Sequence, residues 1–180
     1  WTWDTIVKKE MPLIACLYDM DVFLLKPFSA DGWLGDALVG GREQGRPKGI
    51  RYFWPGLMFL RTPLLPAIET VDLWCGRVRD EPVDVGGQFS LYLEAHPEVK
   101  TKGISGTSVI SRAEGLDSLP VEARESYEDE FKVEVFGGAF LHYRGATGWD
   151  HPSPDLVARK TAWVRRVVEN CLSGTWRMPA

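Results

Sequence analysis

The sequence has few cysteines and no long apolar run, and these two shortages exclude whole classes of protein. Its 180 residues include three cysteines, Cys16, Cys75 and Cys171, and no C-x-x-C pair. An odd, scattered set of thiols argues against a disulfide scaffold or a zinc site and predicts reduced thiols in a packed interior. No stretch reaches about 18 consecutive apolar residues, so we expect no membrane span.

The sequence also has no excess of positive charge and no low-complexity segment. The formal net charge is −4, from 21 Lys and Arg against 25 Asp and Glu. This balance argues against a protein that coats nucleic acid, and we expect no nucleic-acid partner. With 44% hydrophobic and 26% charged residues, the chain is neither disordered, collagen-like nor coiled coil.

The length predicts one domain over residues 1–180, with enough chain to bury a core. The chain begins with Trp1 and shows no signal-peptide pattern, so we expect part of a longer, cytoplasmic protein. Eight tryptophans are many for this length. Most should pack in the core, but flat apolar rings also stack well on sugar faces.

Short apolar runs predict strands, and apolar residues at helical spacing predict helices. Residues 12–18 are almost wholly apolar and favour a strand buried on both faces of a parallel or mixed sheet. Glycines and basic residues over 32–49 predict a mobile loop, and 103–130 is polar and irregular. The other predicted strands are 50–53, 57–60, 133–136 and 139–143, with a turn at 54–56 and helices at 65–73, 88–95 and 153–173. Residues 22–25 form a further apolar run after Asp21.

The closing helix, 153–173, has clear signals at both its start and its buried face. Ser153 can cap it and Pro154 suits the first helical position. Lys160 and three arginines are expected mostly away from the apolar stripe. That stripe is Leu156, Trp163, Val164, Val167, Val168 and Cys171.

The sharpest chemical signal is Asp19-x-Asp21 at the end of the first apolar run. In extended chain, residues i and i+2 point to the same side, so the two carboxylates would face one spot. Close carboxylates repel unless a cation lies between them, and Mg²⁺ or Mn²⁺ prefers oxygen ligands. The pattern predicts a metal–diphosphate anchor, with a structural turn as the alternative.

Three later segments add polar groups that suit the same kind of ligand. Gly56 follows Trp54-Pro55 and precedes an apolar run. A glycine in this position is typical of a site where the backbone lies close to a ligand or another chain segment. A tight turn filled by Trp54 is the alternative. The Gly86–Gly87 pair opens a predicted helix and would leave amide N–H groups for an oxygen-rich ligand, unless it is a simple loop junction. Asp84 and Gln88 flank this pair with groups suited to sugar hydroxyls.

His142 ends the last predicted strand and is followed by Arg144 in a glycine-containing loop. A neutral imidazole can complete a metal shell built on carboxylates, and the guanidinium could hold a phosphate. A histidine with a purely structural role is the alternative.

In this order, the four segments resemble the nucleotide-sugar glycosyltransferases of the GT-A fold, most closely the glycogenin-like family 8. Those enzymes carry a strand ending in D-x-D, an F-N-x-G-hydrophobic segment, an Asp/Gln-rich helix start and an H-x-x-G-x-x-K-P-W loop. The matching stretches in this chain are 18–22, 52–58, 84–88 and 142–149. The resemblance implies an α/β, GT-A-like (Rossmann-related) mixed sheet flanked by helices.

The resemblance also implies roles for these residues. Asp19, Asp21 and His142 would hold Mn²⁺ or Mg²⁺ against the diphosphate of a nucleoside diphosphate sugar, a UDP-sugar. The donor diphosphate would be bound by Arg144, Gly145 and Trp149. The sugar or the acceptor hydroxyl would meet Trp54, Gly56, Gly86, Gly87 and Gln88. Asp84 would be the catalytic base of an inverting enzyme, or a binding residue in a retaining one.

The sequence departs from the family pattern in three places. Trp54-Pro55 stands where an asparagine is expected, and Gly148 stands near the place of the lysine, so Arg144 or Arg42 would neutralise the phosphates. Only 18 residues precede Asp19, too few for the first βαβ segment of that fold. We expect the chain to lack this segment.

Two other functions fit part of the pattern. A non-catalytic carbohydrate-binding remnant would use the tryptophans for packing and sugar contact. A haloacid-dehalogenase-type phosphatase also has a strand-end D-x-D, but Val22-Phe23 lacks the small residue and hydroxyl expected next.

Overall fold

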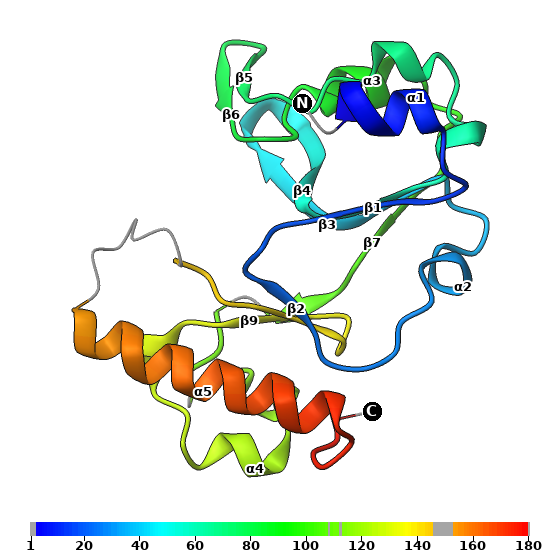
Figure 1. The fold of residues 1–180 in the computed structure, drawn as a ribbon. Coiled ribbons are helices and arrows are strands. Elements are labelled where there is room, and N and C mark those ends of the chain that lie inside the picture. The colour runs from blue at the N-terminus through cyan, green and yellow to red at the C-terminus, as the bar shows by residue number, and fades with distance from the viewer. Residues whose placement is uncertain (1–2, 108, 112, 146–152, 180) are drawn as a thin grey trace. The chain divides into compact units, whose positions relative to one another are not determined.

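The computed structural model describes residues 3–107, 109–111, 113–145 and 153–179, which form a mixed α/β structure with a mixed sheet (Figure 1). The chain divides into two compact units. The first comprises Trp1–Asp19 and Ser29–Ile104, and the second Met20–Phe28 and Ser105–Ala180. The single domain expected over the whole chain stays a prediction.

The first unit is built on a four-stranded sheet in the order β1-β4-β3-β7. Its strands are β1 (Ala15–Tyr18), β4 (Ile50–Leu60), β3 (Val39–Arg46) and β7 (Thr101–Gly103). The long strand β4 pairs antiparallel with β1 and with β3, whereas β3 and β7 are parallel. This combination makes the sheet mixed, as the sequence predicts.

Strand β1 forms where the sequence predicts a strand, but its side chains are not buried on both faces as predicted. It lies at the edge of the sheet and pairs with β4 alone. Ala15 is its only buried side chain. The prediction of a strand buried on both faces is wrong, because an edge strand can be apolar without being covered on both sides.

Strands β3 and β4 overturn two predictions made from glycine and proline. The chain runs in strand from Ile50 to Leu60, so the turn predicted at 54–56 is wrong. Strand β3 crosses the segment 32–49 that the glycines marked as a mobile loop. At Gly41 the backbone has φ +147°, and a Cβ there would lie 2.2 Å from the Leu57 carbonyl oxygen. This glycine therefore permits close strand pairing.

Short helices and one hairpin complete the first unit. The helix predicted at 65–73 is wrong, since only a 3₁₀ turn forms there, at Ile68–Thr70. The helix predicted at 88–95 is confirmed as α3 (Phe89–Ala95). Figure 1 shows α1 and α3 over the same face of the sheet, where the core includes Trp3, Met58 and Phe89. The remaining elements are a π-helical turn (Trp3–Val7), α1 (Lys8–Glu10), α2 (Ala30–Leu34), 3₁₀ turns at Pro47–Gly49 and Thr62–Leu64, and the paired strands β5 (Gly76–Val78) and β6 (Glu81–Val83).

The second unit has an antiparallel sheet in the order β2-β10-β9-β8. Its strands are β2 (Val22–Leu24), β10 (Phe140–His142), β9 (Glu134–Phe136) and β8 (Gly106–Thr107). The strands predicted over 133–136 and 139–143 are thereby confirmed, and the apolar run 22–25 contains β2. The helical elements are α4 (Val121–Arg124), α5 (Pro154–Leu172) and 3₁₀ turns at Leu116–Ser118 and Asp129–Phe131.

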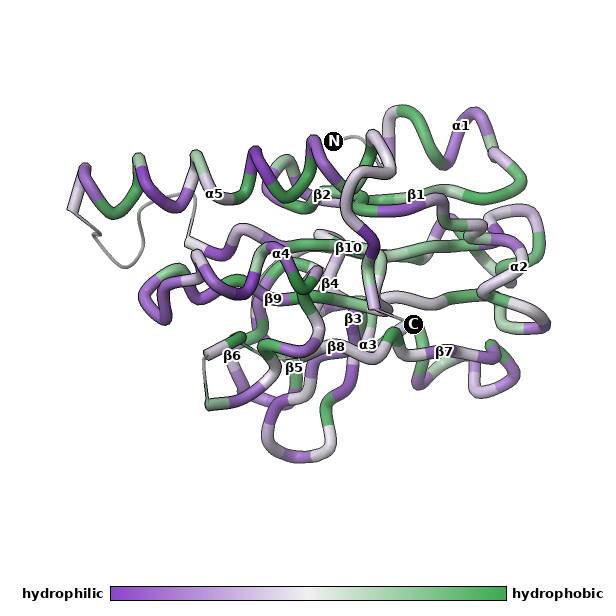
Figure 2. Tube along the Cα trace, turned by 90° about the horizontal axis from the view of Figure 1, so that it is seen from below, coloured by the Kyte–Doolittle hydropathy of each residue, from purple (hydrophilic) through white to green (hydrophobic). Residues whose placement is uncertain are grey.

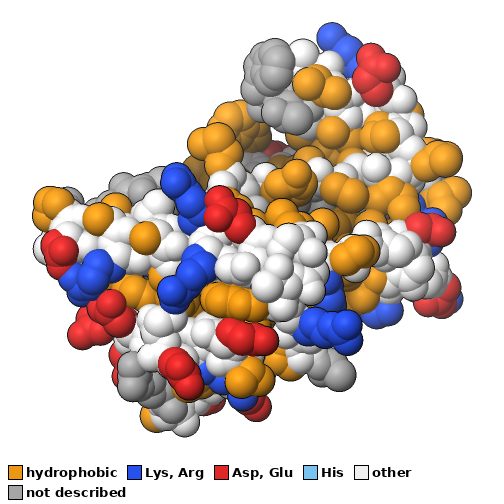
Figure 3. Space-filling view, turned by 60° about the horizontal axis from the view of Figure 1, so that its bottom comes forward, with side chains coloured by type: hydrophobic (Ala, Val, Ile, Leu, Met, Phe, Trp, Pro, Cys, Tyr) orange, Lys and Arg blue, Asp and Glu red, His pale blue; other side chains and the backbone are white. Residues whose placement is uncertain are grey.

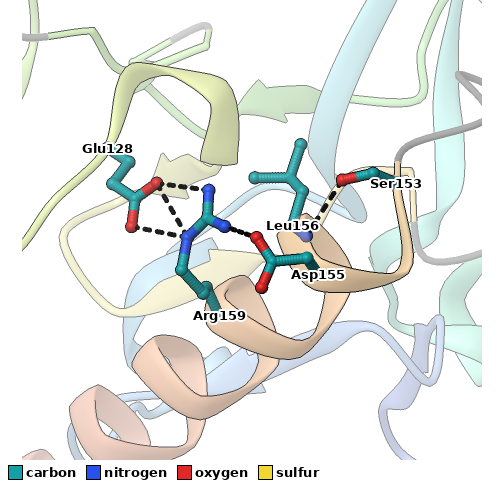
Figure 4. Close-up of polar contacts among 5 residues, drawn as sticks. All are labelled: Glu128, Ser153, Asp155, Leu156 and Arg159. Carbon is teal, nitrogen blue, oxygen red and sulfur yellow. Dashed lines mark hydrogen bonds and ion pairs between the residues drawn. The ribbon is translucent and has the colours of Figure 1, made fainter.

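Helix α5 confirms the prediction for the closing helix and its cap. The Ser153 hydroxyl accepts the backbone N–H of Leu156 at 3.2 Å (Figure 4). Arg159 pairs with Asp155 one turn earlier and with Glu128 at 2.9 Å, joining the helix start to the neighbouring loop (Figure 4). These ion pairs are exposed to water, which screens them, so they contribute little to stability.

The faces of α5 differ in polarity as an amphipathic helix requires. Apolar and polar residues alternate along its tube in Figure 2, and Figure 3 shows charges of both signs interspersed over the surface that carries it. Lys160 departs from the prediction, because it is buried on the apolar side. Its ammonium donates to the Arg144 carbonyl at 2.6 Å and lies 4.1 Å from the centre of the Tyr143 ring.

Aromatic side chains form the centre of the second core. Trp163 of α5 lies 5.3 Å from the ring centre of Tyr127 and 5.6 Å from that of Phe131. Its indole N–H donates to the Ala123 carbonyl at 3.2 Å. The Tyr127 hydroxyl donates to the carbonyl of Ile110. The buried polar atoms of this cluster are thus satisfied by backbone carbonyls.

Burial raises the pKa of Tyr127 to about 12, from an ordinary value of 10.0. The folded state therefore holds the Tyr127 proton more tightly than the unfolded state does. The stabilisation that this provides is complete below pH 10 and disappears as the pH rises through about 12. We expect wild-type stability to fall over this window by on the order of 2 kcal/mol more than that of Tyr127→Phe. Urea denaturation of both proteins at several pH values measures the difference; parallel curves would contradict it.

The thiols correct one further prediction. Cys171 is buried as expected, but Cys16 and Cys75 are exposed, so most of the thiols do not lie in a packed interior. Among the helices of the described residues, none has the length and apolar character needed to cross a membrane.

Candidate functional site

The candidate site is centred on His142, at the end of β10 in the second unit. In the sheet register His142 lies opposite Val22 of β2 and Glu134 of β9. Its Nδ1 lies 2.7 Å from Glu134 Oε2, and its Nε2 lies 3.6 Å from Asp21 Oδ2. The side chains of His142, Glu134 and Asp21 are 13%, 15% and 22% exposed. The fold thus brings Asp21 and His142 together, as the sequence predicts.

Glu134 orients the imidazole ring. A neutral histidine that donates its Nδ1 proton to this carboxylate presents the Nε2 lone pair toward Asp21. The Phe136 ring stacks on the imidazole at 6.2 Å between ring centres, and the Tyr143 N–H donates to the Asp21 carbonyl at 2.8 Å. Ring orientation and backbone position are therefore both fixed around the gap between Nε2 and the carboxylate.

The chemistry of this donor set fits a divalent cation. A carboxylate oxygen and an imidazole nitrogen are both usual ligands of Mn²⁺, and metal-binding histidines commonly donate their other N–H to a carboxylate. Within the described ranges, no group of three His, Cys, Asp or Glu side chains converges as a metal cluster. Asp21 Oδ2 and His142 Nε2 are the two atoms of this group that could hold such an ion.

A groove of about 480 Å³ adjoins Asp21 within the second unit. Tyr143 and one side of α5 form its walls, and the Tyr143 hydroxyl lies 3.0 Å from Thr161 Oγ1. Arg165 and Glu169 add charges along α5. The Asp21 carboxylate therefore borders a space large enough for a sugar-sized group.

Asp19 belongs to the first unit and follows β1. Its N–H donates to the Gly56 carbonyl at 3.0 Å. The premise that residues 19–21 form extended chain is wrong, because Met20 and Asp21 form a turn between β1 and β2. A shared cation between Asp19 and Asp21 stays a prediction.

The glycine at position 56 is explained by packing within the first unit, and not by the ligand or the turn that the sequence pattern predicts. A Cβ at this buried glycine would lie 2.0 Å from the Trp54 ring, so the group that approaches its backbone closely is this indole. The two residues are on one face of β4, two positions apart. The binding roles of Trp54 and Gly56 stay predictions.

The Gly86–Gly87 segment does not offer free amide groups, so that expectation is wrong. The N–H of Gly86 donates to Leu73, that of Gly87 to Asp84 and that of Gln88 to Trp74. A Cβ at Gly86, where φ is +89°, would lie 2.4 Å from a backbone oxygen, and the glycine is required for this turn. The sugar-binding roles of the Asp84 and Gln88 side chains stay predictions.

Asp84 belongs to the first unit, whereas Asp21, Glu134 and His142 belong to the second. Its side chain is exposed, and its Oδ1 accepts the N–H of Val85 at 2.8 Å. Because no described neighbour buries the other oxygen, the carboxylate is open to solvent. Its role as a catalytic base stays a prediction.

The diphosphate residues predicted after His142 are described in part. The Arg144 side chain is exposed, while its carbonyl accepts the Lys160 ammonium. Gly145 has φ +82°, a conformation that favours glycine. Trp149 lies outside the described residues.

The sequence pattern did not single out Glu134, although a signal for it was present. Gly137 and Gly138, with φ +56° and +58°, link β9 to β10. A glycine pair between two apolar runs predicts a hairpin. Pairing across that turn places Glu134 beside His142.

Comparison of the chain with models of known protein families, with curated proteins and with solved structures finds no match. The functional assignment therefore depends on the residues of the site. Of these, the Asp21–His142–Glu134 group is the part whose geometry the fold fixes.

Proposed function

We propose that the protein is a metal-dependent glycosyltransferase that moves a sugar from a nucleoside diphosphate sugar, a UDP-sugar, to an acceptor hydroxyl in glycan or surface polysaccharide synthesis. The GT-A fold and a cytoplasmic location belong to the same proposal. The carrying observation is the oriented imidazole, whose Nε2 lies 3.6 Å from the Asp21 carboxylate. Such a pair is suited to share a cation and is costly to keep for packing alone.

Asp21 and His142 would hold Mn²⁺ or Mg²⁺, with Asp19 as the further ligand that the family resemblance implies. Such an ion, when bound, supplies stabilisation of negative charge on a leaving diphosphate. A hydrogen bond from His142 Nδ1 to Glu134 would hold the imidazole with Nε2 facing Asp21. The groove beside Asp21 offers space for the group that approaches this site.

The proposal is tested by titrating the protein with UDP-glucose and UDP-galactose, with Mn²⁺ and with EDTA, by calorimetry. We expect binding only with Mn²⁺, and a loss of about 10- to 100-fold or more in His142→Ala. His96→Ala is the matched control, because His96 also faces a carboxylate, Glu98 at 3.3 Å, but lies in the first unit.

Two results would overturn the proposal. One is nucleotide-sugar binding that persists in EDTA. The other is Mn²⁺-dependent binding that is the same in His142→Ala as in His96→Ala.

A further inference from the structure

The first unit carries a second groove whose chemistry the proposed metal site does not use. It has a volume of about 400 Å³ and is lined mainly by apolar and aromatic side chains. Three aromatic rings line it, those of Trp3, Tyr18 and Trp74. Grooves with an apolar lining and a few placed polar groups are the usual form of small-ligand sites.

Trp74 has a fixed backbone and an exposed ring. Its N–H donates to Asp72 Oδ1 at 2.8 Å, and its carbonyl accepts the N–H of Gln88 at 3.3 Å. The residue is nevertheless 61% exposed, and Tyr18 is 65% exposed. Rings held this way present broad apolar faces to solvent, a surface that monomeric proteins expose mainly for binding.

Trp3 adds a polar group without a partner. Its side chain is 6% exposed, and its buried indole N–H has no hydrogen-bond acceptor among the residues described. An unpaired buried donor is unfavourable, and an acceptor oxygen on a ligand in the groove that Trp3 lines would satisfy it. This donor is an observation independent of the exposed rings.

The charges of the groove favour an uncharged ligand. Of the described residues that line it, only Asp4 is charged, and that carboxylate pairs with Lys8 at 2.8 Å. Partial desolvation raises the pKa of the Cys16 thiol above its ordinary value of 9.0, so this thiol adds no negative charge to the groove at physiological pH. Because these described lining residues include no cation that could meet a phosphate, a diphosphate has little to bind in this groove.

We infer that this groove, formed by Trp3, Tyr18 and Trp74, binds a neutral saccharide. A sugar ring has one apolar C–H face for an indole and a rim of hydroxyls that accept and donate hydrogen bonds. Both features match the groove, whereas an apolar chain would leave the Trp3 N–H unpaired. The inference uses neither Asp21 nor His142 and stands apart from the proposed transferase activity.

The test is calorimetric titration of the whole chain, in EDTA, with neutral β-1,4-linked hexasaccharides of glucose, mannose and galactose. We expect at least one to bind, and Trp74→Ala to weaken that binding by about tenfold or more. Trp3→Phe keeps the packing ring but removes the N–H, and should weaken binding severalfold. Leu64→Ala is the matched control, because Leu64 is 60% exposed in the same unit and does not line the groove.

Three results would overturn the inference. They are the absence of binding for all three hexasaccharides, equal binding by Trp74→Ala and Leu64→Ala, and preferential binding of the apolar probe 8-anilinonaphthalene-1-sulfonate in this groove without competition by any hexasaccharide. Saccharide binding that persists in EDTA and in His142→Ala supports it even if the proposed transferase activity fails.

Discussion

Asp21→Ala should weaken Mn²⁺ binding by at least about 100-fold and abolish sugar transfer, while the protein folds as the wild type does. The reason is that Asp21 supplies the carboxylate that faces the oriented His142 Nε2 at 3.6 Å. Losing an outer partner of a metal ligand typically costs about 10- to 100-fold, so losing a ligand should cost no less. Asp21 is partly exposed in a turn, so its removal leaves the core intact. Electron paramagnetic resonance of free Mn²⁺ measures the affinity directly.

Two further variants grade the effect. Glu134→Gln leaves both candidate ligands in place but removes the charge that holds Nδ1 of His142, and should cost about tenfold. Asp117→Ala removes an exposed carboxylate of the same unit and should change nothing. If Asp21→Ala binds Mn²⁺ as tightly as Asp117→Ala does, the assignment of the metal site is wrong.

Trp163→Ala should destabilise the second unit by about 3–5 kcal/mol, the cost of removing a large aromatic ring from a core. The side chain is 4% exposed and contacts the rings of Tyr127 and Phe131. The variant also leaves the Ala123 carbonyl without the indole donor that it accepts at 3.2 Å. Urea denaturation followed by circular dichroism measures the loss.

Trp176→Ala is the matched control for that experiment. Trp176 packs at the margin of the same core and is only partly buried, with the Arg166 guanidinium 5.8 Å from its ring centre. Its removal opens less of a cavity and should cost about 1 kcal/mol. Equal losses in the two variants would contradict a core centred on Trp163.

Local sequence signals succeeded where the physical cause is local. A Ser-Pro start and a helical apolar stripe suffice for α5, because capping and burial act within a few turns of one helix. They failed where a tertiary neighbour decides the conformation. The pattern around Gly41 predicted a loop, but the close backbone of β4 is what requires this glycine, and only the paired sheet shows this.

The candidate site shows the same division. His142 and Asp21 could be singled out by residue type and by their places after apolar runs. Glu134 lies beside the imidazole only because of the register of β9 against β10. A slip of one residue would turn the Glu134 side chain to the other face of the sheet. The Gly86 amide likewise donates to the carbonyl of Leu73, a residue that no spacing rule links to it, whereas the Gly87 amide donates to Asp84 within a local turn.

The sequence by itself determined the α/β class, the strand before Asp19, the strand that contains His142, and the extent and cap of the closing helix, because periodicity and end signals act over short stretches of chain. Only the tertiary structure decided that β1 is an edge strand, that Lys160 is buried, and that Glu134 completes the histidine's surroundings. These outcomes depend on which distant backbone or ring lies alongside, and this is a property of strand pairing and core packing.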